Sequence, residues 1–188
     1  KMSVPNGGPG QLGHAILAIS SIPETPKALT KVTHLIATQC FAEGVTLYLR
    51  SGDQLSFRIV FNSKLNIDQV VDPNSLGFPP ISLKTEEGSL SGNISSRVAL
   101  DNAYINIPDV YAEHRFDLRA TKKFDRERGY RTRSLLTLPI AFMGSVQCVL
   151  QLVNAANPEG IFTPDQVDIA MAYAGLIGLR VGSSKDRE

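Results

Sequence analysis

Apolar side chains recur along this chain at two different spacings, and the wider spacing marks its two ends. Between residues 25 and 41, Val32, Ile36 and neighbouring apolar positions return every three or four residues. This period predicts an amphipathic helix. The same period predicts a second helix over residues 164–181, which Thr163 and the following proline are well suited to begin. We expect these two helices to pack against each other.

Between these helices the chain alternates apolar and polar positions in short segments, which is typical of strands. Two pairs of segments are joined by brief turns and predict antiparallel hairpins, and two more segments predict single strands. Between the strands, one short helix is expected to be partly apolar, and another is densely charged and ends at Gly129. The predicted hairpins are 45–50 with 55–61 and 134–142 with 146–154, the single strands 81–84 and 104–107, and the short helices 88–100 and 117–129.

This order of elements predicts an α+β fold in which helices lie against an antiparallel sheet. The 188 residues fit a single domain, which we place at residues 23–183. Residues 1–22 are predicted to be a linker, since the first thirteen are rich in glycine, proline and asparagine and lack the apolar centre of a signal peptide. Residues 184–188 are predicted to be a tail.

Composition and charge narrow the classes of partner. The chain is 43% hydrophobic and 20% charged, as in globular proteins, and its formal net charge is +1, so we expect neither a nucleic acid nor a membrane surface as partner. The apolar run over 135–143 is far too short to span a bilayer. Cys40 and Cys148 form no CxxC motif, which favours a reducing, cytoplasmic location without a metal or other cofactor.

A series of motifs in the second half of the chain resembles one family. These are NIPDVY at 106–111, FD at 116–117, KKFD at 122–125, GYRTRSLL at 129–136, PI at 139–140 and QLVN at 151–154. In order and spacing they resemble GAF domains, in particular those of cyclic-nucleotide phosphodiesterases and bacterial adenylyl cyclases. The resemblance implies a six-stranded antiparallel sheet with the terminal helices on one face and a ligand pocket on the other.

The resemblance also implies a site and a ligand class. Asn62 stands where cyclic-GMP-binding relatives often keep aspartate, and an amide both donates and accepts, so cyclic GMP and cyclic AMP are both candidates. Helix N-termini near Ile94 and Asp117 are expected to offer amide hydrogens to a cyclic phosphate. The positions that the resemblance assigns to ligand binding are Phe61, Asn62, Ile94, Ser95, Tyr111, Phe116, Asp125, Thr132 and Gln151.

One part of the family's nucleotide-binding signature departs from the expected pattern. Its asparagine and phenylalanine are present as Asn154 and Phe162, but Ala155 replaces the lysine, and Gln166 and Val167 replace the acidic pair. The supporting ion pair between lysine and aspartate is therefore impossible in this chain.

Three functions are open at this point. The first is a regulatory, non-catalytic domain of a larger signalling protein, in which ligand occupancy changes how the terminal helices pack and so acts on a covalently linked output domain. The second is a homodimerisation module that pairs through the terminal helices and has an empty pocket. The third is an enzyme like the GAF-fold proteins that reduce free methionine sulfoxide, but neither cysteine here stands at a matching place.

Overall fold

The computed structural model describes residues 26–72 and 77–185, and the predicted linker of residues 1–22 lies outside them. The predicted helices and hairpins are present, although most of their bounds differ by one to six residues. The elements are α2 (Pro26–Gln39), β1 (Ala42–Ser51), β2 (Gln54–Asn62), β3 (Ile67–Val70), β4 (Ile81–Ser82), α3 (Ile94–Asp101), β5 (Ile105–Ile107), α4 (Arg119–Arg128), β6 (Leu135–Phe142), β7 (Ser145–Ala155) and α5 (Pro164–Lys185).

All strand pairs are antiparallel, and six strands form one continuous path in the order β3-β2-β1-β7-β6-β5. The short strand β4 adds to this sheet by pairing with the start of β2. The sequence pattern did not predict β3, an edge strand with mostly exposed side chains. The β6–β7 hairpin turns through Met143 and Gly144, both at positive φ, the backbone conformation that two-residue hairpin turns favour.

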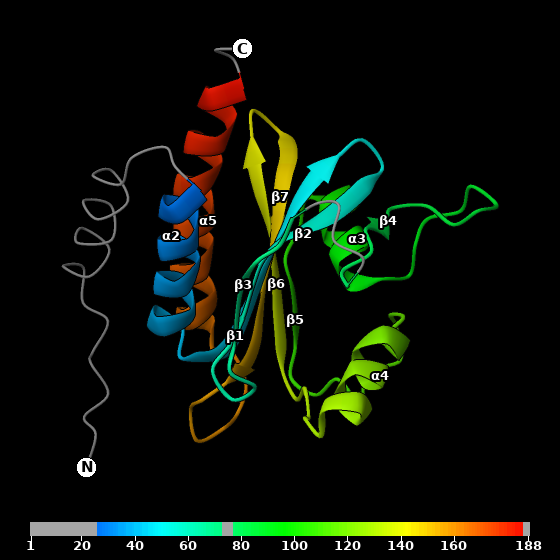
Figure 1. Ribbon diagram of the computed structural model, residues 1–188, viewed down its shortest axis with the longest axis vertical. Helices are drawn as coiled ribbons and strands as arrows, with labels where there is room; N and C mark the ends of the chain where they lie inside the picture. The colour runs from blue at the N-terminus through cyan, green and yellow to red at the C-terminus, as the bar shows by residue number, and fades with distance from the viewer. Residues whose placement is uncertain (1–25, 73–76, 186–188) are drawn as a thin grey trace.

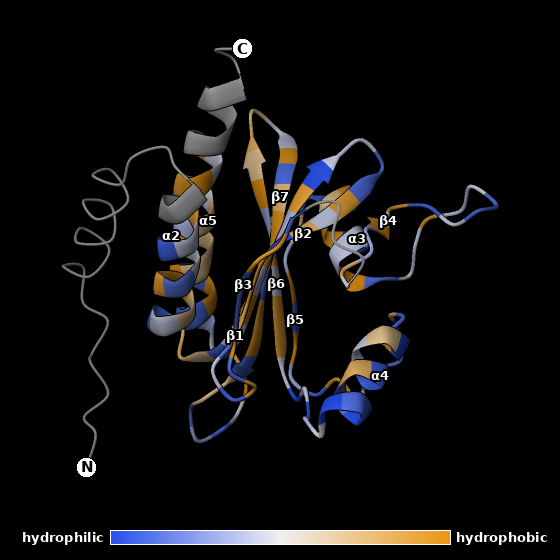
Figure 2. Ribbon diagram, viewed as in Figure 1, coloured by the Kyte–Doolittle hydropathy of each residue, from blue (hydrophilic) through white to orange (hydrophobic). Residues whose placement is uncertain are grey.

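Helices cover both faces of the sheet (Figure 1). On one face, α2 and α5 pack on a core that includes Leu136, Leu138 and Ile140 of β6. On the other, α3 and the segments around it pack on a second core that includes Leu135. Figure 2 shows orange, hydrophobic residues along the central strands between the two groups of helices. Successive side chains of a strand point to opposite faces, so β6 contributes to both cores. The predicted α+β GAF fold, with the terminal helices together on one face, is confirmed.

The C-terminal helix α5 is fixed at both ends of its contact with the sheet. At its start, Thr163 and Gln166 form a capping box, in which the Thr163 amide donates to Gln166 Oε1 at 2.9 Å. Near its end, Gly178 lies so close to the Ala141 carbonyl of β6 that a Cβ atom there would collide with it. Within the described residues, no helix is long and apolar enough to cross a membrane.

Candidate functional site

A row of polar side chains crosses the sheet on the face away from α2 and α5. Thr46 of β1 pairs in register with Gln151 of β7, and Gln151 pairs with Thr137 of β6. Each of the three follows and precedes residues of the terminal-helix core, so each points to the other face. Gln151 Nε2 donates to Thr137 Oγ1 at 3.0 Å, and Thr137 is fully buried. We call Thr46, Thr137 and Gln151 the polar row.

Tyr48 and Ser95 extend the polar row toward α3. The Tyr48 phenol interacts with the hydroxyls of Ser95 and Thr46, and both Tyr48 and Ser95 are almost completely buried. Burial raises the pKa of Tyr48 to about 12, although the two hydroxyls oppose the shift. The phenol therefore remains protonated at neutral pH and offers a hydrogen to an acceptor in this layer.

Helix α3 begins with an asparagine cap. Asn93 has extended backbone angles and its Oδ1 accepts from the amides of Ser95, at 2.9 Å, and Ser96, at 3.3 Å. Ile94 and Ser95, which the resemblance assigns to the ligand, are both buried under this first turn. The Ser95 amide expected to meet a phosphate thus already has an acceptor within the protein.

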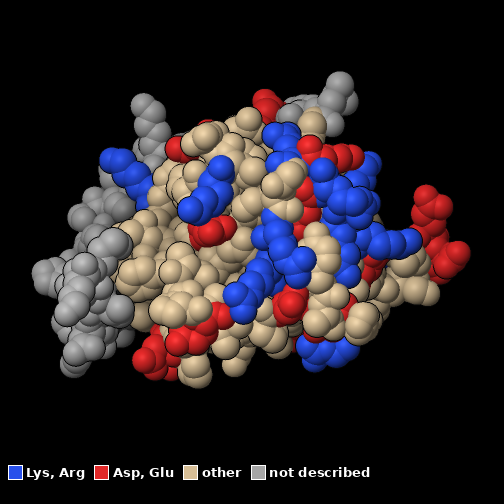
Figure 3. Space-filling view, turned by 90° about the horizontal axis from the view of Figure 1, so that it is seen from below, with Lys and Arg blue, Asp and Glu red and all other residues tan. Residues whose placement is uncertain are grey.

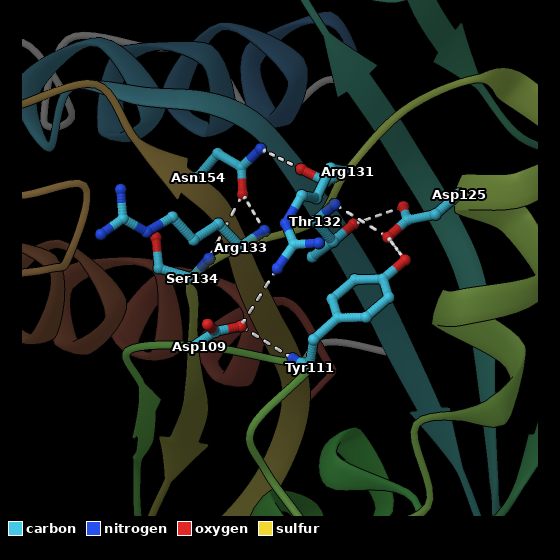
Figure 4. Close-up of polar contacts among 8 residues, drawn as sticks. All are labelled: Asp109, Tyr111, Asp125, Arg131, Thr132, Arg133, Ser134 and Asn154. Atoms are coloured by element: carbon cyan, nitrogen blue, oxygen red, sulfur yellow. Dashed lines mark hydrogen bonds and ion pairs between the residues drawn. The ribbon is translucent and has the colours of Figure 1, made fainter.

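Three of the predicted site residues form one hydrogen-bonded unit (Figure 4). The carboxylate of Asp125, 1% exposed, accepts from the Tyr111 hydroxyl at 2.9 Å and from the Thr132 amide and hydroxyl at 2.8 Å each. This unit, the Asp125 latch, joins α4 to the segment that leads into β6. Three donors compensate the cost of burying the carboxylate, so its acceptor sites are largely used inside the protein.

Two cations lie over the ring of Tyr111. The Arg131 guanidinium carbon is 4.3 Å and the Lys122 Nζ 5.4 Å from the ring centroid, distances at which a cation is attracted to an aromatic face. Arg131 also lies 3.9 Å from a carboxylate oxygen of Asp109. Burial and the hydrogen bond to Asp125 raise the pKa of Tyr111. These contacts hold the loop and α4 together at the edge of the second core.

Helix α4 has an acidic residue at its N-terminus. Asp117 Oδ1 accepts from the Arg119 amide at 3.1 Å, and its carboxylate also pairs with the Arg119 guanidinium at 2.7 Å. The hydrogen bond from the Arg119 side chain lowers the pKa of Asp117 to about 2, so this carboxylate is charged at neutral pH. Phe116, just before it, packs against the second core, as the resemblance implies for a residue beside the ligand.

The two predicted residues of β2 lie apart from this group. Phe61 faces the terminal helices, where its ring is 4.5 Å from that of His34 on α2, so the structure does not bring it to the polar row. A bulge at Arg58 causes this, because it reverses the faces of the residues that follow. Asn62 is buried at the end of β2, and its Oδ1 accepts from the amides of Lys64 and Leu65 in a local turn.

Amide side chains make the contacts around the positions where the family signature is altered. Asn157 Nδ2 donates to Gln166 Oε1 at 3.1 Å, and Gln166 Nε2 donates to the Cys40 carbonyl at 2.9 Å, which ties the ends of α2 and β7 to the start of α5. Asn154 Nδ2 donates to Glu43 at 3.0 Å and to the Tyr130 hydroxyl at 2.9 Å. Hydrogen bonds from Asn154, Asn157 and Gln166 therefore connect this region, without a lysine–aspartate ion pair at the altered positions.

Sequence reasoning missed Thr46, Tyr48, Thr137 and the cap Asn93. The signal for the first three was a polar side chain between apolar neighbours in a predicted strand, as in LTL at 136–138. Which face such a residue occupies follows only from the register with neighbouring strands. For Asn93, the signal was a favoured N-cap residue directly before Ile94, the first residue of α3.

The two cysteines lie away from the polar row. Both are fully buried in the core under the terminal helices, and burial raises the pKa of Cys40 to about 12. A catalytic thiol needs a low pKa and access to its substrate, so these positions do not favour the thiol chemistry of the enzymatic hypothesis.

The fold, the sheet order and the hydrogen-bonded layer over the sheet define the class of protein. The GAF domain model matches residues 24–181, and the chain therefore belongs to the GAF family. Two curated relatives are a dual 3',5'-cyclic-AMP and -GMP phosphodiesterase 11A of Takifugu rubripes and a probable 3',5'-cyclic phosphodiesterase of Caenorhabditis elegans. They are 30% and 31% identical over 47% and 51% of this chain, and the matches span only 9% and 12% of their own lengths.

Solved structures share the fold at low sequence identity. The GAF domain of a phosphoenolpyruvate-protein phosphotransferase from Coxiella burnetii has a TM-score of 0.68 at 13% identity, over 94% of this chain and 93% of its own. A GAF domain from A. aeolicus scores 0.65 at 15% identity, over 95% and 96%. A free methionine-R-sulfoxide reductase from Neisseria meningitidis scores 0.63 at 13%, over 94% and 89%. The fold thus occurs in an enzyme as well as in isolated GAF domains.

Proposed function

We propose that this chain is the regulatory domain of a larger signalling protein and binds a small molecule between the sheet and helices α3 and α4. The polar row is the observation that carries this proposal, because hydrogen-bonding side chains in an apolar layer are the usual composition of a ligand site. The half-buried Gln151 supports it further. Its only hydrogen bond among the described residues uses its nitrogen, so its Oε1 is free to accept from a ligand.

Strand β6 offers a physical connection from this site to the C-terminal helix. It begins just after Thr132 of the Asp125 latch, carries Thr137 of the polar row, and ends beside Gly178 of α5. Gly178 packs so closely on the Ala141 carbonyl that a side chain there would collide with it, so a shift of the end of β6 toward α5 would press directly on the helix. We propose that ligand occupancy shifts α5 along this route and thereby acts on a covalently linked output domain.

The phosphodiesterase relatives make cyclic GMP and cyclic AMP the first ligands to test. Isothermal titration of the purified domain with each, combined with native mass spectrometry of freshly purified protein, measures binding directly. We expect at least one small molecule to be retained or to bind with measurable heat. A protein that shows no heat with either nucleotide or with its base and nucleoside, and that carries no retained molecule, contradicts the sensor function.

A homodimerisation module is the second candidate, and one feature of α5 favours it. Met171, Gly175 and Leu179 follow one another at steps of four on the exposed side of the helix, and Leu179 is 62% exposed. Such a stripe suits pairing with the same helix of a second copy. Light scattering should show a dimer that Leu179→Glu dissociates into monomers. A monomer mass at every concentration of the unaltered chain counts against this function.

A further inference from the structure

The hydrogen-bonding groups of the polar row and its extension are all uncharged. Thr46, Thr137, Gln151, Tyr48 and Ser95 supply hydroxyls and one amide, and none of them carries a charge at neutral pH. The charged group buried nearby, the carboxylate of the Asp125 latch, is an acceptor and already has three donors. An anion placed in this layer would lose its hydration without gaining a compensating cation.

At the N-termini of α3 and α4, two amides and one amide respectively already have a side-chain acceptor within the protein. Backbone amides at a helix start are the usual means of holding an anion without lysine or arginine. At α3, Asn93 Oδ1 takes the amides of Ser95 and Ser96, and at α4, Asp117 takes the amide of Arg119. Asp117 is also paired with the Arg119 guanidinium at 2.7 Å, so the two side chains offset each other's charge at this helix start.

Three of the basic side chains around α4 are exposed and paired, and a fourth, Lys122, is half-buried with its Nζ 5.4 Å from the centroid of the Tyr111 ring. Lys and Arg gather over the α4 side of the face in Figure 3, with Asp and Glu interspersed among them. The Arg115, Arg119 and Arg131 side chains are 71%, 89% and 63% exposed, and each is paired with a carboxylate of its own. The charges of these three arginines are therefore paired at the surface, where salt and water screen them.

On these observations, and resting on the proposed function, we infer that the layer over the polar row takes an uncharged polar ligand and disfavours one that carries a phosphate. The chemical class is a neutral planar heterocycle with donors and acceptors at its edges, such as a nucleobase or nucleoside. Asn93 is the residue that determines this specificity, since its side chain occupies the amides that would otherwise hold a phosphate.

The test compares neutral and phosphorylated forms of the same base. Isothermal titration measures guanine, guanosine and cyclic GMP, and adenine, adenosine and cyclic AMP, on the unaltered chain and on Asn93→Gly. Glycine is itself a favoured N-cap residue, so the variant keeps α3 while freeing two amides. The matched control is Asn102→Gly, the same substitution at the other end of α3, where Asn102 has a left-handed conformation that glycine adopts readily.

For the unaltered chain we expect a base or nucleoside to bind at least about tenfold more tightly than its cyclic nucleotide. In Asn93→Gly the affinity for the cyclic nucleotide should rise by about tenfold, a change of 1.4 kcal/mol in binding free energy. Affinity for the neutral ligand should stay within about threefold, and Asn102→Gly should alter neither. A retained molecule identified by native mass spectrometry as uncharged supports the same conclusion.

Two results overturn the inference, and they are distinguishable from failure of the proposed function. Tighter binding of a cyclic nucleotide than of its nucleoside, or a retained molecule that carries a phosphate, refutes the inference and leaves the sensor function intact. An unchanged preference in Asn93→Gly refutes the role of Asn93. If none of the six compounds binds and no molecule is retained, both the sensor function and this inference are refuted.

Discussion

The two faces of the sheet are built from the same strands but differ in what they bury. Under α2 and α5 the side chains of β6 and β7 are wholly apolar, including Leu136, Leu138, Leu150 and Leu152, and all four are fully buried. On the opposite face, under α3, the same strands carry the buried Thr137 and the half-buried Gln151. Buried polar groups cost stability unless they are paired, whereas close-packed aliphatic groups contribute to it. The first face therefore holds the domain together, and the second gives up some stability to keep hydrogen-bonding groups in place.

The largest effect is expected from damage to the first face. Leu150→Ala removes a fully buried side chain from the centre of β7 and should lower the free energy of unfolding by about 2–5 kcal/mol. Urea denaturation followed by circular dichroism measures this loss. Leu90→Ala, at a position that is 53% exposed, is the matched control and should change stability by less than about 0.5 kcal/mol. If Leu150→Ala and Leu90→Ala lowered the stability equally, the burial of Leu150 would not be what makes it important.

Breaking the Asp125 latch should have the next largest effect. Asp125→Ala leaves the Tyr111 hydroxyl and both donors of Thr132 without their acceptor, and we expect a loss of about 1–3 kcal/mol in stability. If the site is as proposed, ligand affinity should also fall. Glu127→Ala, an exposed acidic residue on the same helix, is the control and should alter neither. Unchanged affinity in Asp125→Ala would separate the latch from the ligand site.

Removing the polar row sharpens the comparison because it should affect binding and not stability. The double variant Thr137→Val and Gln151→Leu replaces both partners of one hydrogen bond, so unfolding free energy should stay within about 1 kcal/mol of the unaltered chain. Binding of the ligand found by titration should be lost. Thr137→Val alone leaves the Gln151 amide without its acceptor and should be the less stable of the two variants. A double variant that binds normally would remove the polar row from the site.

The smallest effect on stability is expected from the surface pair of Glu113 and Arg115, and it should depend on pH. Hydrogen bonds from the exposed Arg115 lower the pKa of Glu113 from 4.5 to about 2. A carboxylate with a lowered pKa in the folded state stabilises it above its ordinary pKa, and this contribution disappears as the pH falls toward 2. The unaltered chain should exceed Glu113→Gln in thermal midpoint at pH 6 and approach it by pH 2.5. Because the Arg115 side chain is 71% exposed, solvent screens its end of the pair, and the difference in unfolding free energy should stay below about 1 kcal/mol.

Much of the architecture could be predicted because its signals are local. The spacing around Val32 and Ile36 identifies a helix, and Thr163 with Gln166 has the spacing of a capping box that the structure contains. The family motifs predicted a six-stranded antiparallel sheet with the terminal helices on one face, but not the order of its strands. Strand β3 was missed because its exposed side chains carry no apolar alternation, and only pairing with the edge of β2 makes it a strand.

Apart from the edge strand β3, the amino-acid sequence by itself determined which segments become helices and strands, since these depend on neighbours within a few residues. Tertiary structure alone decided which face each polar side chain occupies. A single bulge at Arg58 turns Phe61 toward α2, although Leu55 and Phe57 of the same alternating run pack under α3. Register also aligns Thr46, Gln151 and Thr137, which are far apart in the chain. Such alignments depend on pairing between distant strands, and no local pattern encodes them.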